Sequence, residues 1–283
     1  IALLVLYYCF PKKYRWYVLL AGSMAYYVII CKWYVLFIIF TICTTYGSTI
    51  WIDKLLKEQN AIVKSHKEDW DRQTRKEYKE KGRKKRVAVM LFALLCNFGI
   101  LAFLKYIPYA GELGLLLPLG ISFYTFQSMG YVMDVYREIV EPEKNFLKVA
   151  LFVSFFPQII QGPIAIYDKL AGQLYEGHSL RLENLQKGAL LVLWGVIKKL
   201  VIADRAVNII NFVMDKPMDF SGTYVFFAAV VYALQLYADF SGGIDIVRGI
   251  AEMFGITMST NFNHPYFSRS LTEYWPVSYT HLR

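Results

Sequence analysis

Two carboxylates stand close together in a largely apolar part of the chain, in the stretch YADFSGGIDI at residues 237–246. Asp239 and Asp245 lie on either side of Ser241 and a pair of glycines. An ionisable side chain inside a membrane segment is costly, and it usually faces a cavity or a partner and marks function. Asp239 and Ser241 are therefore candidates for the wall of a substrate passage. For Asp239 a purely structural role stays equally open.

Asp245 has a simpler explanation as the first residue of a helix. Asp is favoured at that position because its side chain accepts a hydrogen bond from a free backbone N–H. Apolar residues recur after it at helical spacing up to residue 254. The sequence therefore favours a helix that begins at Asp245. The glycines at 242 and 243 weaken any helix there and allow another backbone to approach closely.

The remaining polar candidates are weaker. Asn261 and Asn263 could contact a ligand, although Asn near a proline is typical of turns. The four histidines are His66, His178, His264 and His281. We expect the first two to be solvated in loops, the third to have a loop role beside a proline, and the fourth to lie in a foreign tail. The four cysteines show no C-x-x-C spacing, so neither a metal site nor a disulfide framework is expected.

The composition indicates a membrane protein. Of the 283 residues 56% are hydrophobic and only 19% are charged, and the mean hydropathy is +0.35. A soluble domain of this length would need more polar surface, and the apolar residues fall in blocks near the length of about 20 residues that spans a bilayer. These blocks do not alternate as the strands of a β-barrel would. The predicted class is an all-α integral membrane protein with several spans.

The apolar runs predict where the membrane-spanning helices lie along the chain. The predicted apolar helices cover residues 16–30, 33–51, 87–107, 113–136, 185–203 and 224–237. The first two are separated by two residues and predict a tight helical hairpin. Lys198 and Lys199 interrupt the run at 185–203, and we expect them to extend toward the membrane surface at a helix end.

Two further segments do not fit a straight span. Residues 151–167 are apolar but contain Pro157, Gly162 and Pro163, which predicts a broken or re-entrant element. Irregular backbone at membrane depth must be buried in protein or line a wet cavity. Residues 168–185 are polar and are expected to form a loop.

The net charge of +9 is concentrated in one segment. Residues 53–86 contain thirteen basic and seven acidic residues, a net charge of +6. Nucleic-acid binding would use such a patch, but cytoplasmic loops between spans also accumulate Lys and Arg. The second explanation is favoured, because the basic cluster at residues 12–15 lies two spans earlier and would face the same side. We therefore expect 53–86 to be a basic cytoplasmic loop.

Four stretches together carry a family resemblance. They are LPLGISFYTFQSMGYVMDVYR at 117–137, FPQIIQGPI at 156–164, KKLVIADR at 198–205, and the long stretch from Tyr237 to Trp275. In order and spacing they resemble the membrane-bound O-acyltransferase family, in its bacterial branch of alginate O-acetyltransferases and teichoic acid D-alanyl transfer proteins. The resemblance runs from the N-terminal spans to Trp275.

The resemblance implies a fold, a reaction and partners. Members of the family form a multi-span helical bundle around a transmembrane tunnel and transfer an acyl group from a cytoplasmic thioester to a hydroxyl. The implied donor is acetyl-coenzyme A or an acyl carrier protein, with no bound cofactor. Both are acidic, so the basic segment could attract either. The implied acceptor is an exported polysaccharide, reached with an extracytoplasmic esterase-like partner, and the implied location is the bacterial inner or plasma membrane.

The end of the chain departs from the family pattern. After TEYW the family continues into an arginine-rich stretch with its essential histidine in a later span, whereas this chain reads PVSYTHLR. Residues 1–275 are thus expected to form the N-terminal and central part of one membrane domain, and residues 276–283 a non-native tail. On this interpretation no catalytic residue lies in the chain, and the chain alone is inactive.

Three other functions stay open from the sequence. D-alanyl transfer to teichoic acid would use the same fold. A transporter or flippase of a lipid-linked sugar would share the broken helices, and inverted repeats would favour it; the sequence displays none that we can recognise. A non-catalytic membrane scaffold is the third alternative.

Overall fold

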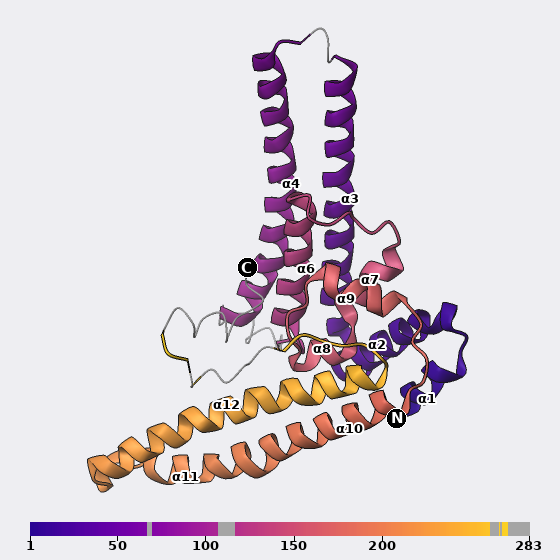
Figure 1. Ribbon diagram of the computed structural model, residues 1–283. Coiled ribbons are helices and arrows are strands. Elements are labelled where there is room, and N and C mark those ends of the chain that lie inside the picture. The colour runs from indigo at the N-terminus through magenta and orange to yellow at the C-terminus, as the bar shows by residue number, and fades with distance from the viewer. Residues whose placement is uncertain (67–69, 107–116, 261–265, 267, 271–283) are drawn as a thin grey trace. The chain divides into compact units, whose positions relative to one another are not determined.

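The computed structural model describes residues 1–66, 70–106, 117–260, 266 and 268–270, and these residues form helices joined by short connections (Figure 1). No strand occurs among them, so the predicted all-α class is confirmed. Three helical stretches are long and apolar enough to cross a membrane: Lys12–Ser65, Arg72–Tyr106 and Gly222–Met253.

The chain divides into two compact units, which are described separately. The first unit comprises Ile1–Arg15, Ile160–Ala165 and Glu176–Arg283. The second unit comprises Trp16–Ile159 and Ile166–Tyr175. Each unit therefore combines segments that are far apart in the sequence.

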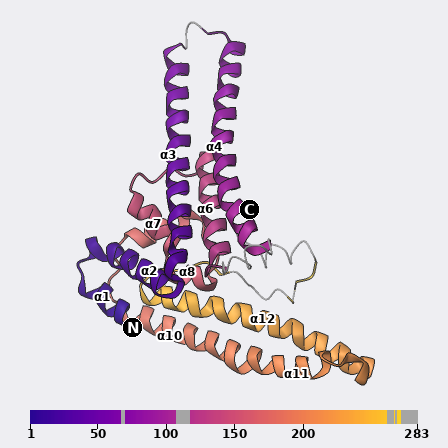
Figure 2. The same cartoon turned by 180° about the vertical axis from the view of Figure 1, so that it is seen from behind.

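In the second unit, the predicted hairpin of two adjacent spans is wrong. Helix α2 (Arg15–Cys31) leads through a 3₁₀ turn, η2 (Lys32–Tyr34), into α3 (Val35–Ser65). Lys32 takes the left-handed conformation, with φ of 48°, where the chain changes direction. The views from both sides show α2 leaving α3 at a wide angle and not running back along it (Figures 1 and 2). The two-residue spacing therefore marks a bend.

Three helices form the core of the second unit, because α3, α4 (Arg72–Tyr106) and α6 (Ile121–Tyr136) all pack on one another. The residues of α4 that face this core recur every three or four positions, as expected for an amphipathic helix. Its buried residues are Arg86, Val89, Ala93, Asn97, Leu101 and Leu104. Asn97 donates a hydrogen bond from Nδ2 to Thr44 Oγ1 on α3 at 2.9 Å, so one polar contact fixes the pairing of two otherwise apolar surfaces.

The predicted loop at residues 53–86 is mostly helical, because α3 continues to Ser65 and α4 begins at Arg72. We call residues 53–66 and 70–86 the basic arm. Gln59 is buried between the two helices and donates from Nε2 to the carbonyl of Lys79 at 2.8 Å. It lies over Gly82, where a Cβ would come within 2.5 Å of its amide carbon. The charged halves of both helices thus pair with each other, while the membrane side they face remains a prediction.

The arm is also fixed at its base. Arg86, which is buried, contacts Glu138 with 2.8 Å between Nη1 and Oε1. Glu138 follows α6 and takes the left-handed conformation, with φ of 61°. The ion pair therefore ties the arm to the turn that ends α6.

The predicted broken element is confirmed as irregular backbone. Helix α7 (Phe146–Ser154) stops one residue before α8 (Phe156–Gln161), and residues 162–166 are not helical. Part of the predicted loop at 168–185 is helical instead, because α9 covers Tyr167–Tyr175. Whether the broken element re-enters a membrane stays a prediction.

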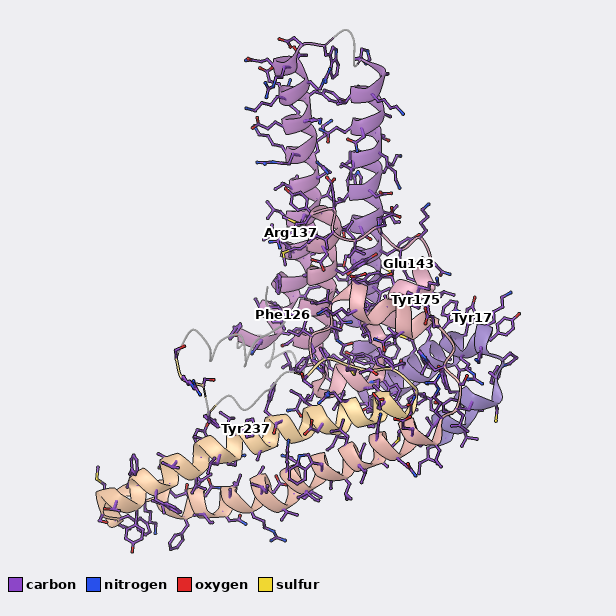
Figure 3. The ribbon with its side chains drawn as sticks, in the orientation of Figure 1. Tyr17, Phe126, Arg137, Glu143, Tyr175 and Tyr237 are labelled. Carbon is purple, nitrogen blue, oxygen red and sulfur yellow. The ribbon has the colours of Figure 1, made fainter. Side chains whose placement is uncertain are left out.

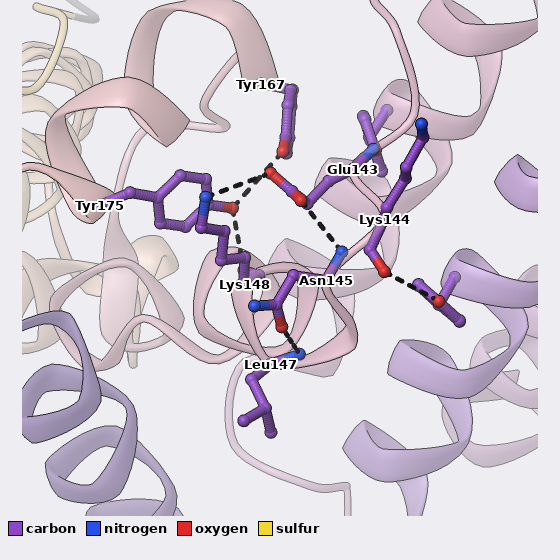
Figure 4. A network of polar contacts seen from close by, with 9 residues as sticks. Glu143, Lys144, Asn145, Leu147, Lys148, Tyr167 and Tyr175 are labelled. Carbon is purple, nitrogen blue, oxygen red and sulfur yellow. Dashed lines mark hydrogen bonds and ion pairs between the residues drawn. The ribbon is translucent and has the colours of Figure 1, made fainter.

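A polar network holds α7 and α9 together (Figure 4). Tyr175 on α9 donates to the carbonyl of Lys148 at 2.9 Å, and Lys148 pairs with Glu143 at 3.7 Å. Glu143 also accepts from the backbone N–H of Asn145, whose own side chain caps α7 by accepting from Leu147 N–H. Burial raises the pKa of Tyr175 above its ordinary value, so this hydroxyl keeps its proton and stays a donor.

The first unit is built on two antiparallel helical stretches (Figure 1). One runs without interruption through α10 (Leu182–Val196), a π-helical segment η3 (Ile197–Ala203) and α11 (Asp204–Met214). After a 3₁₀ turn, η4 (Pro217–Asp219), the other is α12 (Gly222–Met253). The helix predicted to end at residue 203 therefore continues, and no new helix begins at Asp245.

The N-terminal helix α1 (Ala2–Cys9) packs at the C-terminal end of α12. Tyr8 donates its hydroxyl proton to the carbonyl of Met253 at 2.7 Å. Arg15, beyond the short turn η1 (Lys12–Tyr14), donates to the carbonyls of Tyr8 and His178 and lies over the ring of Tyr8. One guanidinium thus joins α1 to the segment before α10.

Candidate functional site

Glycines bring the backbones of α10 and α12 into direct contact. A Cβ at Gly242 would lie 2.8 Å from the carbonyl oxygen of Gly195, and a Cβ at Gly195 would lie 2.5 Å from that of Gly242. One heptad away, Gly188 and Gly249 meet in the same manner, at 2.6 Å each way. Small residues at such seams allow helices in membranes to pack closely. The expected close backbone approach at Gly242 is therefore confirmed.

This contact sets which side chains can meet. Since the helices are antiparallel and Gly195 faces Gly242, Lys198 is level with Asp239. Side chains on a helix tilt toward its N-terminus, and the long chain of Lys198 extends in that direction. Its Nζ reaches Oδ2 of Asp245 at 2.7 Å. Lys199 contacts Asp239 instead.

The inner part of the site is a buried charge cluster. The side chains of Lys198 and Asp245 are only 15% and 12% exposed. Arg248, one turn further along α12, adds a contact of 3.3 Å from Nη1 to Oδ1 of Asp245. Both carboxylate oxygens of Asp245 therefore have a cationic partner, which a buried charge requires.

The prediction that Asp245 caps a helix is therefore wrong. Asp245 lies inside α12, which runs unbroken from Gly222 to Met253. The two glycines that would weaken an isolated helix are compatible with α12, since Gly242 accommodates the backbone of α10. Tertiary packing has overridden local propensity at this position.

The outer part of the site is more open. Lys199 Nζ lies 2.6 Å from Oδ1 of Asp239 and 3.2 Å from Oδ1 of Asp204, so it bridges α12 and the start of α11. All three side chains are between 36% and 44% exposed. Lys198 and Lys199 do not lie at a helix end, as the sequence suggested, but in η3 within a continuous helix. A π-helical segment of this kind is frequent at functional sites.

The other predicted site residues have different outcomes. Ser241 is buried, and its hydroxyl has no hydrogen-bond partner within the described part of the chain. Asn261 and Asn263 lie outside the described residues. None of these observations assigns a role, so the passage-lining function of Asp239, Ser241, Asn261 and Asn263 stays a prediction.

The broken segment contributes one more polar group to the first unit. A Cβ at Gly243 would overlap the side-chain amide of Gln161. Gly243 is one helical turn beyond Asp239, so both residues share one face of α12. On nearly the opposite side of α12, Tyr237, labelled in Figure 3, packs edge-to-face on Tyr266 with 5.7 Å between ring centroids.

The histidines described by the structure lie elsewhere. His66 is half-buried on the arm and stacks on Trp70, so the prediction of a fully solvated position is wrong for this residue. His178 is half-buried against Gly255, and its backbone N–H donates to Tyr7 Oη at 3.2 Å, so the prediction of a fully solvated position is wrong. His264 and His281 lie outside the described residues. No histidine among the described residues joins the charge cluster around Asp239 and Asp245.

Sequence reasoning missed that the two lysines and the two aspartates are partners. The sequence contained one indication of this pairing: two lysines in one largely apolar stretch and two aspartates in another. Charges that are buried are usually paired. This indication could not assign which lysine meets which aspartate, because the pairs are separated by 40 and 47 residues.

Comparison with known proteins identifies relatives of this chain. The chain is 32% identical over 224 residues to the peptidoglycan O-acetyltransferase of Helicobacter pylori, an alignment that covers 66% of this chain and 42% of that protein. It is 38% identical over 162 residues to a probable alginate O-acetylase of Pseudomonas syringae, covering 56% of this chain and 30% of that protein. The chain is homologous to the membrane-bound O-acyltransferases. The predicted resemblance is thereby confirmed.

The homology to membrane-bound O-acyltransferases extends to a more distant branch. The teichoic acid D-alanyltransferase of Bacillus subtilis is 25% identical over 163 residues, covering 56% of this chain and 40% of that protein. No family model matches the chain. The chain thus spans about two fifths or less of the length of these relatives. Together with the three apolar helical stretches, the homology makes this an all-α membrane protein.

Proposed function

We propose that the chain is part of a membrane-bound O-acyltransferase that transfers an acetyl group to a hydroxyl of an exported polysaccharide. The observation that carries the proposal is the similarity to an O-acetyltransferase of peptidoglycan across 66% of the chain. Higher identity to the two O-acetyl-transferring relatives than to the D-alanyltransferase favours acetyl over D-alanyl as the transferred group.

The proposed reaction uses a thioester donor, acetyl-coenzyme A or an acylated carrier protein, on the cytoplasmic side. A general base removes the proton from the acceptor hydroxyl. The oxygen then attacks the thioester carbonyl, the oxyanion is stabilised by hydrogen-bond donors, and the thiolate leaves. No residue of this chain is assigned as the base. The protein would lie in the bacterial inner or plasma membrane with several spans, and an extracytoplasmic esterase-like partner would receive or orient the polysaccharide.

The charge cluster supports a positional role in this reaction. Asp239 and Lys199 are the partly open members of the cluster, whereas Asp245 and Lys198 are enclosed. We assign Asp239, with Ser241, Asn261 and Asn263, to the lining of the substrate passage. Lys198, Asp245 and Arg248 would hold α10 and α12 in place.

The test uses the full-length parent protein in proteoliposomes. Labelled acetyl-coenzyme A, acetyl carrier protein or D-alanyl carrier protein is enclosed, and alginate, peptidoglycan or teichoic acid is supplied outside. Parallel proteoliposomes contain a lipid-linked sugar in their membrane. Acetyl label should appear on alginate or peptidoglycan as an ester that mild base removes. Transfer of D-alanine alone would replace the proposal with the D-alanyl alternative. Movement of a lipid-linked sugar without any acyl transfer would replace it with a flippase.

A further inference from the structure

The distal half of α4 carries an unusual concentration of positive charge. Residues 72–86 contain nine basic and two acidic residues, a net charge of +7 over four helical turns. In Figure 3, nitrogen-tipped side chains project from this part of α4 away from α3. The two helices of the arm contact each other at Gln59 and Gly82, so these charges lie on a helix that packs against α3.

Four of these cations form a continuous stripe. Arg72, Lys76, Lys79 and Arg83 follow the spacing i, i+4, i+7, i+11, which places them on one flank of the helix. All four are exposed, and none forms an ion pair with another residue in the part of the chain that the structure describes. At 1.5 Å per residue the stripe is about 16 Å long.

Three other lysines of the arm form ion pairs within their own helix. Lys54 lies 3.9 Å from Glu58, Lys57 lies 2.5 Å from Asp53, and Lys84 lies 3.6 Å from Glu80, each one turn apart. An exposed helix surface is ordinarily stabilised by such alternation of charge. The four residues of the stripe do not form such pairs in the described part of the chain, although the same helix contains acidic residues.

The stripe is unfavourable for an isolated helix. Like charges three or four residues apart destabilise a helix, and cations in its first turns oppose the positive end of the helix dipole. Asp71 caps this end, because its side chain accepts the backbone N–H of Thr74 at 2.7 Å. The four charges therefore fit a partner that would neutralise them.

We infer that the stripe is a docking surface for an acidic helical segment of a second protein. Carboxylates on three turns of a partner helix, at the same i, i+4, i+7, i+11 spacing, would face all four cations together. This inference does not depend on the enzymatic proposal, because it follows from the charges and packing of the arm.

The geometry favours a protein partner over a lipid surface. Apolar sequence begins at Val87, so Arg72 stands about 22 Å from it along the helix, whereas salt screens charges beyond about 8 Å. A lipid surface at the apolar boundary would reach only the end of the stripe near Arg83.

The binding test uses the chain in nanodiscs of zwitterionic lipid. The probe is a fluorescent helical peptide with glutamates at positions i, i+4, i+7 and i+11, and its dissociation constant is measured by anisotropy at two salt concentrations. The stripe variant changes Arg72, Lys76, Lys79 and Arg83 to Gln. The matched control removes the same number of charges elsewhere on the arm, as Lys54→Gln, Lys57→Gln, Lys81→Gln and Lys85→Gln.

We expect the stripe variant to bind the peptide about tenfold more weakly and the control to change about threefold or less, because position and not total charge sets the contact. A variant with glutamate at all four stripe positions should bind a matching lysine peptide, which would show that its helix is intact. Equal loss in both glutamine variants, or no peptide binding by the unmodified chain, would overturn the inference. Tighter stripe-dependent binding of anionic vesicles or of an oligonucleotide would overturn it as well.

Discussion

Lys198 and Asp245 form an enclosed ion pair, with 2.7 Å from Nζ to Oδ2, across two helices whose backbones touch at glycines. Leaving a buried charge uncompensated costs about 3–5 kcal/mol, and Lys198→Met should cost less than this because Arg248 still contacts Asp245. We expect Lys198→Met to lower the unfolding midpoint in detergent. The triple variant Lys198→Met, Asp245→Leu and Arg248→Met, which removes all three charges, should recover most of the loss. A single variant as stable as the parent would show that the pair is solvated.

The outer pair should behave differently from the inner one. Lys199 and Asp239 are more than one third exposed, so Asp239→Asn should cost about 1 kcal/mol or less. In the full-length parent we expect Asp239→Asn to reduce acyl transfer per molecule, and Asp245→Asn mainly to reduce the amount of folded protein. The comparison requires activity normalised to protein in the membrane fraction. The same specific activity for Asp239→Asn and the parent would remove Asp239 from the passage.

The backbone contact between Gly195 and Gly242 can be tested with one substitution at the contact and one control substitution elsewhere. Gly195→Leu places a side chain where the carbonyl of Gly242 lies, so it should separate α10 from α12 and break both lysine contacts. Gly47→Ala on α3 meets no atom within 4 Å and should be neutral or stabilising by about 0.5–1 kcal/mol, from helix propensity alone. Thermal unfolding of the two variants measures the difference. Similar midpoints would contradict direct backbone contact.

The arm offers a test of its internal clamp. Gly82→Val should push Gln59 out of its buried position and open the distal ends of α3 and α4. Spin labels at Lys57 and Lys85, both exposed, would report a longer and broader distance distribution in the variant. Gly99→Ala, also on α4 but in open space, is the control. An unchanged distribution would mean that other contacts hold the arm.

The start of α4 should depend on pH through Asp71. Hydrogen bonds from Thr74 hold the pKa of this carboxylate below its ordinary value. The capping stability is therefore fully present above the unfolded value of about 3.9, and it is lost as the pH falls through the lower folded value. Hydrogen exchange of the amides at 73–76 should accelerate in that acidic range in the parent. In Asp71→Ala these amides should be fast at every pH.

The orientation of the arm can be measured directly. Because its net positive charge favours the cytoplasm, a single cysteine at Ser65, in a background with all native cysteines replaced, should resist an impermeant thiol reagent applied to intact cells. Labelling should appear once the membrane is permeabilised. Labelling in intact cells would reverse the orientation.

The sequence allowed much of the helical architecture to be predicted, because long apolar runs leave few alternatives to α3, α4 and α12. Its errors have physical causes. The charged segment at 53–86 was interpreted as a loop from its polarity, yet its helices are stabilised by pairs one turn apart, such as Lys57 with Asp53, and by the buried Gln59. Both are contacts that composition does not show.

The site was predictable in part. Asp239 and Asp245 stood out because carboxylates near apolar sequence are rare, but the role of Asp245 was misjudged. Two glycines beside it suggested a helix boundary, whereas one of them makes room for the backbone of Gly195. That contact joins residues 47 positions apart, and rules based on local sequence cannot predict contacts between such distant residues.

The π-helical segment at 197–203 has a consequence for how this helix tolerates length changes. A π turn is equivalent to one residue inserted into an α-helix. Deleting a single residue there, for example Val201, would remove the extra residue and restore regular winding, with little rotation of the helix after it. Asp204 would then stay near Lys199, and Lys198 before the deletion would keep Asp245. The same deletion in the regular helix α10, between Gly188 and Gly195, should instead rotate the following residues by about 100° and carry both lysines away from α12.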